Sequence, residues 1–498
     1  MRITPDLKTF ARLTKKGNLI PVYAEVMADL ETPVSAFLKI QTGGPSFLLE
    51  SVEAGTTQGR YSFLGCKPSL ILEAGNGKLK TTQNGKTKTA TFTGDPLKRL
   101  EEALSKYKAV AVPELPIFSG GAVGYLSYET SRFYERLPKP KGKPEFPDMI
   151  FMLADTLIVF DHLRRNMKIV SNAFVPKGAS AQAIKASYQL AVDRIETLSR
   201  VLHASNPEAA SMRTAKLPVN KPVSNFTPAG FAAAVKASKE YIRKGDIIQV
   251  VLSQRIKTQI ECDPFDVYRS LRSLNPSPYM FYLNFGETRL IGSSPEVHVR
   301  CENGRVTLKP IAGTRPRGSS EREDETLAKE LLADPKERAE HVMLVDLGRN
   351  DLGRVCTTGS VKVDELMVIE RYSHVMHIVS RVTGKLRDDK NAYDVVRATF
   401  PAGTVSGAPK IRAMQIIHEL EPLARGPYAG LVGYMGFSGN FDSCITIRTL
   451  FMKSKTGYIQ SGAGIVMDSD PHKEWLETQN KARGVLKAIE IAHGGLQS

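Results

Sequence analysis

The chain has 498 residues, a length that corresponds to about three domains of ordinary size. Hydrophobic residues make up 42% and charged residues 24% of it, and 68 basic against 52 acidic side chains give a net charge of +16. This composition excludes a disordered chain. No run approaches the ~18 consecutive apolar residues of a membrane span, and the N-terminus lacks the apolar core of a secretory signal. We therefore expect a globular protein that binds no membrane.

The five cysteines are scattered, without a Cys-x-x-Cys pair or a histidine at metal-ligand spacing. This pattern supports neither a disulfide framework nor a zinc site, and it fits a reducing, cytoplasmic location. The basic excess is compatible with nucleic acid, with a small anionic substrate or with a solvated lysine-rich face. The sequence has no zinc finger, RRM-like aromatic residues or basic amphipathic helix, so we expect no nucleic-acid partner.

Residues 204–226 are rich in Pro, Ser, Ala and Asn and predict an exposed linker between an N-terminal region, 1–203, and a C-terminal region, 227–498. After the linker, Thr227 caps a helix that has Pro228 at its first position and ends at Gly245. Further helices are predicted where an Asp-Pro pair supplies the cap and the first residue, at 263–264, 334–335 and 470–471.

Strand signals alternate with these helices. Residues 246–256 and 279–285 are β-rich, Asn303-Gly304 predicts a tight hairpin, and 444–452 alternates around Arg448 as a strand does. Because the strands come in hairpins more than in strict βαβ alternation, the sequence predicts an α+β fold with large, mostly antiparallel sheets packed with helices in a sandwich.

Two predicted helices carry paired carboxylates near their start, Glu337 with Glu340 and Glu474 with Glu477. Residues three apart share one face of a helix, and two hard oxygen ligands suit Mg²⁺. The alternative is structural, because Glu337 could close a capping box with Asp334 and acids in a first turn favour the helix dipole.

Two glycine-rich segments could bind anions. Gly462-Ala463-Gly464 exposes backbone N–H groups, although a bulge explains such a run as often, and 400–410 contains Thr404 and precedes a helix. The required Gly-Lys-Ser/Thr of a Walker loop is absent, so nucleotide binding is not expected.

Three further features involve charged or titratable residues. Residues 311–318 hold Gly313, Thr314 and two arginines, which suits a carboxylate. His377 lies in a strand-like run, where a satisfied core histidine is the commoner case than an acid–base catalyst. Arg448 would need an anion if it faces inward, and would otherwise be exposed.

Many of these residues stand in blocks that carry a family resemblance. In order, the blocks are LLES (48–51), NPSPYMFYL (275–283), SSPEV (293–297), PIAGTRPRG (310–318), ERAEHVMLVDLGRNDLGRV (337–355), YSHVMHIVSRV (372–382), GTVSGAPKIRAM (403–414), RGPYAGLVGY (425–434), CITIRT (444–449), QSGAGIVMDSDP (460–471) and ETQNKA (477–482). The chain resembles the anthranilate synthase component I (large subunit) family of chorismate-utilising enzymes, densely over 227–490 and more thinly over 18–160. The resemblance implies the first committed step of tryptophan biosynthesis, in which ammonia adds at ring C2 of chorismate, the C4 hydroxyl leaves and pyruvate is eliminated.

The resemblance assigns roles residue by residue. Mg²⁺ would be held by Glu340 and Glu477, supported by Glu337 and Glu474, with Glu337 also counted among the catalytic residues. His377 with Thr404 would assist departure of the hydroxyl. Chorismate would be bound by Gly313, Thr314, Tyr428, Arg448 and the backbone of Gly462, Ala463 and Gly464.

Regulation and assembly are also implied by the resemblance. L-Tryptophan would inhibit from a pocket to which the N-terminal region contributes, formed by Ser51, Pro278, Tyr279, Met280, Val432 and Tyr434. No cysteine lies on a glycine-rich nucleophile turn. A separate glutamine amidotransferase subunit, component II, would therefore supply ammonia, in a heterotetramer of two large and two small subunits.

Two sister activities are the alternatives within the same family. Isochorismate and salicylate synthases carry a lysine that activates water where this chain has Gln249, and aminodeoxychorismate synthases carry a lysine nucleophile where it has Ala312. Neither residue can act as a base or an amine nucleophile. Both differences favour direct attack of ammonia at C2.

Overall fold

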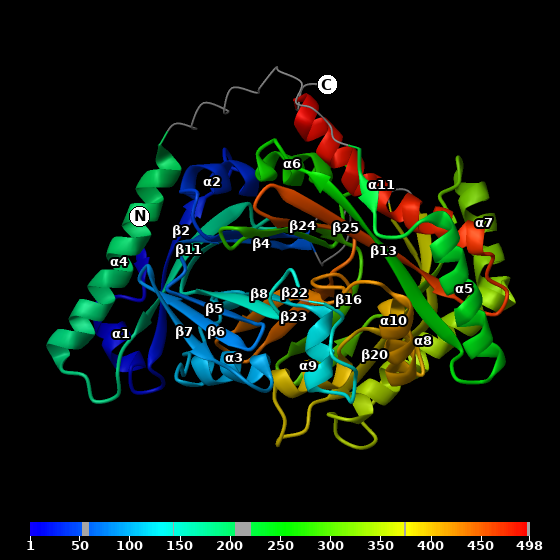
Figure 1. The fold of residues 1–498 in the computed structure, drawn as a ribbon. Coiled ribbons are helices and arrows are strands. Elements are labelled where there is room, and N and C mark those ends of the chain that lie inside the picture. Colours follow the sequence, from blue (N-terminus) through cyan, green and yellow to red (C-terminus); the bar gives the residue numbers. More distant parts are fainter. Residues whose placement is uncertain (52–58, 143, 205–220, 373–374, 496–498) are drawn as a thin grey trace.

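The structure, a computed structural model, describes residues 1–51, 59–142, 144–204, 221–372 and 375–495. Two large β-sheets lie face to face, and helices cover the outer side of each (Figure 1). Their long strands pair antiparallel. The predicted α+β fold, with large antiparallel sheets packed with helices, is therefore confirmed.

The first sheet has thirteen strands among the described residues, in the order β1-β2-β11-β10-β4-β3-β14-β15-β24-β25-β13-β12, with β21 beside β13. The strands are β1 (Ile3–Thr4), β2 (Leu19–Met27), β3 (Ser46–Glu50), β4 (Tyr61–Cys66), β10 (Thr156–Asp161), β11 (Asn166–Phe174), β12 (Val223–Ser224), β13 (Gln249–Gln259), β14 (Tyr279–Asn284), β15 (Thr288–Ser294), β21 (Gly407–Ala408), β24 (Thr449–Lys453) and β25 (Thr456–Ile465).

The second sheet has twelve strands in the same described ranges, in the order β18-β20-β17-β16-β23-β22-β8-β9-β5-β6-β7, with β19 beside β20. The strands are β5 (Leu70–Gly75), β6 (Lys78–Gln83), β7 (Lys86–Thr91), β8 (Gly121–Leu126), β9 (Met149–Ala154), β16 (Val297–Glu302), β17 (Arg305–Leu308), β18 (Ile311–Pro316), β19 (Lys362–Arg371), β20 (Val375–Lys385), β22 (Leu431–Gly436) and β23 (Phe441–Ile445).

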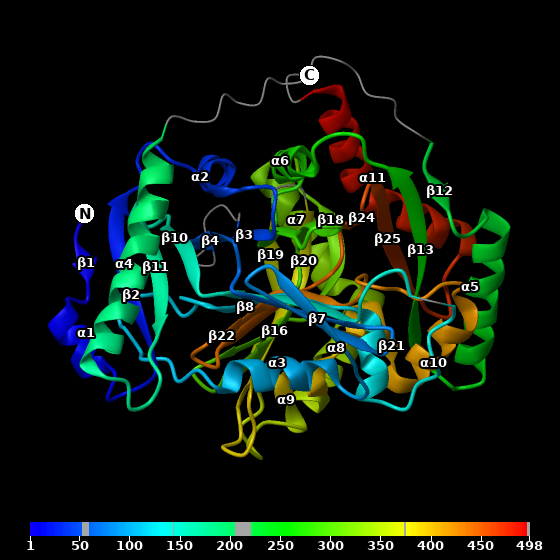
Figure 2. The same ribbon diagram turned by 60° about the vertical axis from the view of Figure 1, so that its left-hand side comes forward.

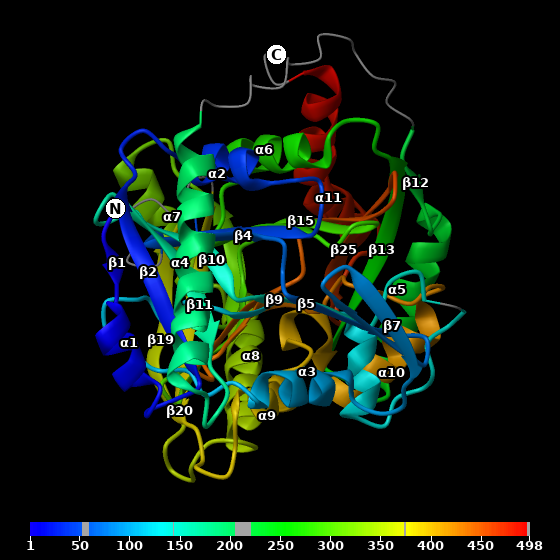
Figure 3. The ribbon, with the colours of Figure 1, turned by 90° about the vertical axis from the view of Figure 1, so that its left-hand side faces the viewer.

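Helices close the sandwich on both sides. They are α1 (Leu7–Leu13), α2 (Pro33–Ile40), α3 (Pro96–Ser105), α4 (Ala181–His203), α5 (Pro228–Arg243), α6 (Pro264–Leu274), α7 (Glu321–Ala333), α8 (Pro335–Gly353), α9 (Ala392–Thr399), α10 (Lys410–Leu420) and α11 (Pro471–Gly494). Figure 2 shows α3 and α9 along the outer side of the second sheet, and Figure 3 shows α2, α4 and α6 over the first.

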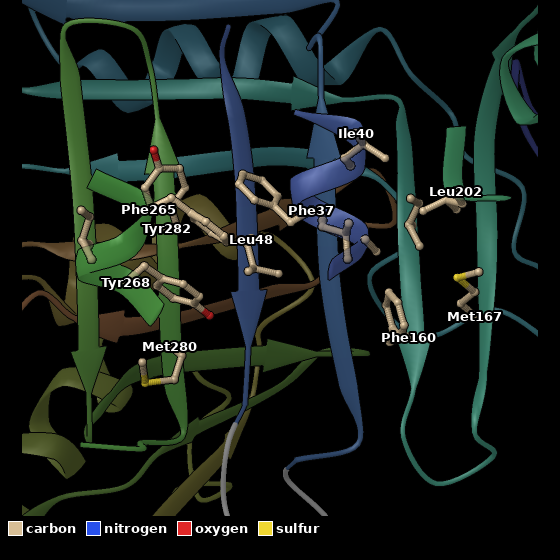
Figure 4. Close-up of a cluster of buried hydrophobic side chains, with 14 of the residues drawn as sticks. Phe37, Ile40, Leu48, Phe160, Met167, Leu202, Phe265, Tyr268, Met280 and Tyr282 are labelled. Atoms are coloured by element: carbon tan, nitrogen blue, oxygen red, sulfur yellow. The ribbon is translucent and has the colours of Figure 1, made fainter. Parts of the chain in front are cut away.

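Three large apolar cores hold these layers together, and a small fourth one lies between α7 and β20. The outer core of the first sheet joins Phe37 of α2 and Phe265 of α6 to Leu48 and Tyr282 of the strands beneath (Figure 4). A second core fills the space between the sheets, and a third lies under α3, α8 and α9. Each fully buried Leu, Ile or Phe contributes roughly 1.5–3 kcal/mol relative to an exposed one, so the cores supply most of the driving force for stacking the layers.

The predicted helix starts are confirmed. The side chains of Thr227, Asp263, Asp334 and Asp470 cap α5, α6, α8 and α11, each with a proline in the first turn. Glu337 does not close a capping box, because the backbone N–H of Asp334, which its side chain would have to accept from, donates to the carbonyl of Glu330 at 3.0 Å. The predicted strand 444–452 is wrong as one element, because the chain leaves the second sheet after β23 and enters the first at β24.

Strands from both sides of the predicted linker share both sheets, since β3 pairs with β14 and β8 pairs with β22. The predicted boundary at 204–226 therefore does not separate two sets of sheets, and residues 205–220 of it lie outside the described residues. No helix in the described ranges is both long and apolar enough to cross a membrane.

Candidate active site

The site is built where the chain crosses from one sheet to the other. Glu296 lies between β15 of the first sheet and β16 of the second, and Arg448 lies between β23 and β24. The crossings are joined by backbone hydrogen bonds, from the N–H of Ile445 to the carbonyl of Glu296 at 3.0 Å and from the N–H of Ser293 to the carbonyl of Arg448 at 3.2 Å. A carboxyl group and a guanidinium are thereby fixed close to each other.

Arg448 carries a charge that the protein does not neutralise. No carboxylate of the described residues lies within ion-pair distance of its guanidinium, and burial lowers its pKa. Its φ of +52° is a left-handed conformation that costs a non-glycine residue roughly 1–2 kcal/mol. A half-buried cation without an ion-pair partner, held in a strained backbone conformation, indicates a binding site for an anion.

The predicted glycine cradle lies on β25, opposite β13. A Cβ atom at Gly462 would lie 2.6 Å from the Tyr428 hydroxyl oxygen, and one at Gly464 would lie 2.6 Å from Nε2 of Gln249. A Cβ at Gly462 would also meet the backbone carbonyl of Leu252 at 2.9 Å, so that position excludes a side chain, whereas one at Gly464 would displace the side chain of Gln249. Burial raises the pKa of Tyr428 to about 12, so its hydroxyl stays a donor at neutral pH. Ala463 is fully buried, and its side chain belongs to the core between the sheets.

His377 is oriented by β18. Its Nδ1 lies 3.0 Å from the carbonyl oxygen of Gly313 and 3.0 Å from Oγ1 of Thr314, its partner in the strand pairing. The carbonyl only accepts, so Nδ1 carries the proton and Nε2 is left as the acceptor. Burial lowers the pKa of His377, which keeps the imidazole neutral. The structure thus brings together His377, Gly313 and Thr314, all three of them predicted site residues.

Thr404 is not a partner of His377. Its buried hydroxyl has no hydrogen-bond partner within 3.5 Å among the described residues, and it faces Glu296, whose pKa it lowers. Burial outweighs this effect, and the charges of Lys481 and Arg448, and raises the pKa of Glu296 to about 7. Glu296 is the titratable residue that sequence reasoning missed. The available signal was a glutamate inside the matching block SSPEV, directly before a strand.

The first carboxylate pair lies in the opening turns of α8. Glu340 accepts a hydrogen bond from Nε2 of Gln249 at 2.9 Å. Glu337 lies 3.5 Å from Nη1 of Arg315 and next to Gly313, where a Cβ would be 3.1 Å from its carboxylate. Burial, then the charge of Glu340, raises the pKa of Glu337, and the charge of Arg315 lowers it.

The second pair lies in the opening turns of α11. Nζ of Lys481 bridges Glu477, at 2.6 Å, and the carbonyl oxygen of Gly462, at 3.0 Å, which ties this carboxylate to the cradle. Burial raises the pKa of Glu474, and the charge of Lys336 at the start of α8 lowers it, so the two helix starts face each other. Lys481 and Glu477 also line, with Arg448, a cavity of about 580 Å³.

No three or more His, Cys, Asp and Glu side chains within the described ranges are grouped as ligands of one metal ion. The donor set nevertheless fits Mg²⁺, which takes one or two protein carboxylates and completes its shell with water and substrate oxygens. The two pairs of glutamates at the starts of α8 and α11 provide such carboxylates, Glu340 and Glu477 among them.

The predicted effector residues lie between the sheets near β3. The pairing of Met280 with Glu50 sets Ser51 beside Tyr279 and Pro278, and the Tyr279 hydroxyl donates to Asp442 at 2.7 Å. Asp442 is in turn the pairing partner of Tyr434, and Val432 lies two residues before Tyr434 in β22. Met280 differs, because its side chain points into the outer core of the first sheet (Figure 4). Residues 52–58, after Ser51, are outside the described part.

Comparisons with known proteins agree with this arrangement. Residues 45–487 match the family model of the chorismate binding enzymes. The chain is 51% identical to anthranilate synthase component 1 of Synechocystis sp., over 98% of this chain and 99% of the relative, and 48% identical to that of Acetivibrio thermocellus, with the same coverage.

Solved structures show the same fold. Anthranilate synthase component I from Streptococcus pneumoniae superimposes with a TM-score of 0.75 at 37% identity, over 92% of this chain and 98% of the other. The menaquinone-specific isochorismate synthase of Escherichia coli has a TM-score of 0.69 at 20% identity, over 98% and 99%. From its sequence, its fold and this site, the chain belongs to the chorismate-binding enzyme family.

Proposed function

We propose that the chain is the large subunit of an anthranilate synthase, which converts chorismate and ammonia to anthranilate, pyruvate and water. The observation that carries this proposal is the unpaired Arg448 beside the Gly462–Gly464 cradle, opposite two pairs of carboxylates. Chorismate carries two carboxylates, so one can meet a cation of the protein and the other a metal ion. The full-length relatives named anthranilate synthase component 1 support the same assignment.

Arg448 and the Tyr428 hydroxyl bind the enolpyruvyl carboxylate in this proposal, because the Tyr428 hydroxyl lies against Gly462 of the cradle and the charge of Arg448 acts on Tyr428, with no carboxylate of the described residues paired to Arg448. Glu340 and Glu477 hold Mg²⁺, with Glu337 and Glu474 adding negative charge around it. A Mg²⁺ ion held by these residues would supply Lewis-acid chemistry, by neutralising the ring carboxylate of chorismate and so favouring attack by a nucleophile.

Proton transfers fall to Glu296 and His377, which differ in protonation at neutral pH. Glu296, with a pKa of about 7, retains a proton that it can give to the departing C4 hydroxyl, which leaves as water when ammonia bonds to C2. Neutral His377 has a free Nε2 that can take the C2 proton when the enolpyruvyl group leaves as pyruvate. The family resemblance implied that His377 and Thr404 assist departure of the hydroxyl. The interaction of Thr404 with Glu296 supports assigning this step to Glu296 and the later removal of the C2 proton to His377.

The chain selects ammonia over water because it offers water no base at this position. The Gln249 amide lies over Gly464 and donates to Glu340, so it can orient a small molecule but cannot remove a proton. Ala312 of β18 is buried and has no amine that could form a covalent ring adduct. Neutral ammonia needs neither a base nor a covalent ring adduct in order to attack C2.

Two further properties belong to the same proposal. L-Tryptophan inhibits by binding between Ser51 and Tyr434, a position that contacts both sheets and could therefore favour one arrangement of them. A glutamine amidotransferase subunit supplies ammonia, in a heterotetramer of two large and two small subunits. The word component in the relatives' name supports the existence of such a partner.

Chromatography of the products made from chorismate and Mg²⁺, with and without ammonium, tests the assigned reaction. We expect anthranilate with ammonium and neither isochorismate nor 4-amino-4-deoxychorismate in either case. Gln249→Lys should add a slow formation of isochorismate, with Gln249→Asn as the control that brings no base. Isochorismate from the native chain at a rate comparable to anthranilate would refute the assignment.

A further inference from the structure

Arg425 and Glu421 form an ion pair that is closed off from solvent, with side chains only 1% and 4% exposed. Nη2 of Arg425 lies 2.6 Å from Oε1 of Glu421, and Nε lies 2.9 Å from Oε2. The guanidinium is thus bidentate on the carboxylate, which fixes both side chains in one orientation.

The other donors of Arg425 reach backbone carbonyls beside the active site. Nη1 donates to the carbonyl of Val405 at 2.7 Å, and Nη2 donates to the carbonyl of Val251 at 2.6 Å. Val405 ends the turn that contains Thr404, and Val251 lies opposite Gly464 in the pairing of β13 with β25. The guanidinium carbon also lies 5.5 Å from the ring centre of Tyr428.

Glu421 holds the same strand two residues further on. Its Oε1 accepts hydrogen bonds from both the backbone N–H and the hydroxyl of Ser253, each at 2.8 Å. Ser253 lies opposite Gly462. The ion pair therefore binds the two β13 residues that face the two glycines of the cradle.

Stability alone explains this arrangement poorly. Desolvating two charges costs several kcal/mol, and apolar replacements of a buried ion pair are often neutral or stabilising. The ion pair instead supplies hydrogen bonds of defined direction. Its donors and acceptors fix the strand beside the cradle, the turn of Thr404 and the ring of Tyr428. The N-terminal region adds to this, since Glu129 accepts from the backbone N–H groups of Arg425 and Gly426 at 2.7 and 2.9 Å.

We propose that Arg425, with Glu421, is a positioning residue that sets the spacing between the Gly462–Gly464 cradle, Thr404 and Tyr428. That the ligand bound at this site is chorismate rests on the proposed function. That Arg425 and Glu421 hold β13 in place does not depend on it. Lysine at 425 can keep the charge but has one ammonium in place of a planar fork, so it cannot serve Glu421 and both carbonyls with the same geometry.

The test compares Arg425→Lys and Glu421→Gln with Arg397→Lys. Arg397 is a half-buried arginine of α9 whose guanidinium pairs with Asp95, Glu101 and Asp394, none of which is a site residue. Hydrogen exchange measured by mass spectrometry should rise in peptides covering 249–254, 403–408 and 460–465 in the first two variants, while a peptide covering β11 keeps its protection. The KM for chorismate should rise about tenfold in them and stay within twofold in the control.

Each outcome has a distinct meaning. A purely structural role would increase exchange everywhere and lower the active fraction without moving KM, which would overturn the inference, as would unchanged exchange in the three peptides. If one variant does not fold, the other variant's exchange pattern decides in the same way. If exchange rises in the three peptides of the variants but the native protein makes no anthranilate, the role of Arg425 and Glu421 in holding β13 would be supported and the proposed function would be refuted.

Discussion

Arg448 and Glu296 owe their properties to single backbone positions at which the chain passes between sheets. Arg448 has a left-handed conformation and no carboxylate partner in the described ranges, so its charge is available to a ligand. Glu296 is withdrawn from water next to Arg448 and Lys481, and burial dominates over both charges in raising its pKa to about 7. A cation and a proton donor therefore lie side by side in the free protein.

The pH dependence of turnover tests the role of Glu296. The protonated carboxyl is the active form, so kcat/KM should be highest below pH 7 and fall tenfold per pH unit above it. Assays at a fixed concentration of neutral NH₃ remove the titration of the nucleophile. Glu296→Gln should lower kcat by about 10²–10⁴-fold and remove the fall in kcat/KM at high pH. If the variant kept the same fall, the titrating group would be another residue.

Ser51 tests the effector pocket at the same scale. Ser51→Phe should fill the space next to Tyr279 and abolish inhibition by tryptophan while leaving kcat with ammonium unchanged, because the residue is not among those of the active site. Ser51→Ala serves as the matched control and should retain inhibition. Unchanged inhibitory potency of tryptophan on Ser51→Phe would locate the pocket elsewhere.

Among the elements, α8 and α11 define the candidate metal site, because each begins with an Asp cap and a proline and presents a glutamate pair on one face. Burial raises the pKa values of Glu337 and Glu474, and repulsion from Glu340 and Glu477 respectively raises them further. A dication between them would relieve this repulsion.

Glu340→Gln and Glu477→Gln should each abolish turnover and weaken Mg²⁺ binding without unfolding the chain. Trp475, the only tryptophan, lies between the two α11 glutamates, so its fluorescence can report Mg²⁺ binding independently of activity. Glu490→Gln on the same helix is the control, since Glu490 pairs only with Lys487 on the surface. A near-normal rate at low Mg²⁺ in either site variant would show that the residue is not a ligand.

The whole molecule is a sandwich whose two sheets both draw strands from the two ends of the chain, and this decides what the sequence can predict. Caps, first-turn prolines and the turn at Asn303 depend on neighbouring residues, so those elements were predictable. The break at Arg448 was not, because the sheet that each strand joins depends on partners more than a hundred residues away. The importance of Glu296 was hidden for the same reason, since only the crossing of the sheets brings it to Arg448.

The basic excess also has a partial explanation at this scale. The hairpin of β6 and β7 forms a free edge of the second sheet and carries Lys78, Lys80, Lys86 and Lys88. Lysines on an exposed edge strand oppose edge-to-edge association with another sheet. This part of the charge therefore fits a solvated lysine-rich face.

The most direct test of the account is the fluorescence of anthranilate formed by the purified chain from chorismate and Mg²⁺, with ammonium or with glutamine as the nitrogen source. We expect continuous formation of anthranilate with ammonium and none with glutamine until an amidotransferase subunit is added. Chorismate that stays unconsumed with ammonium would contradict the proposed reaction, and anthranilate formed from glutamine by this chain alone would contradict the two-subunit assignment.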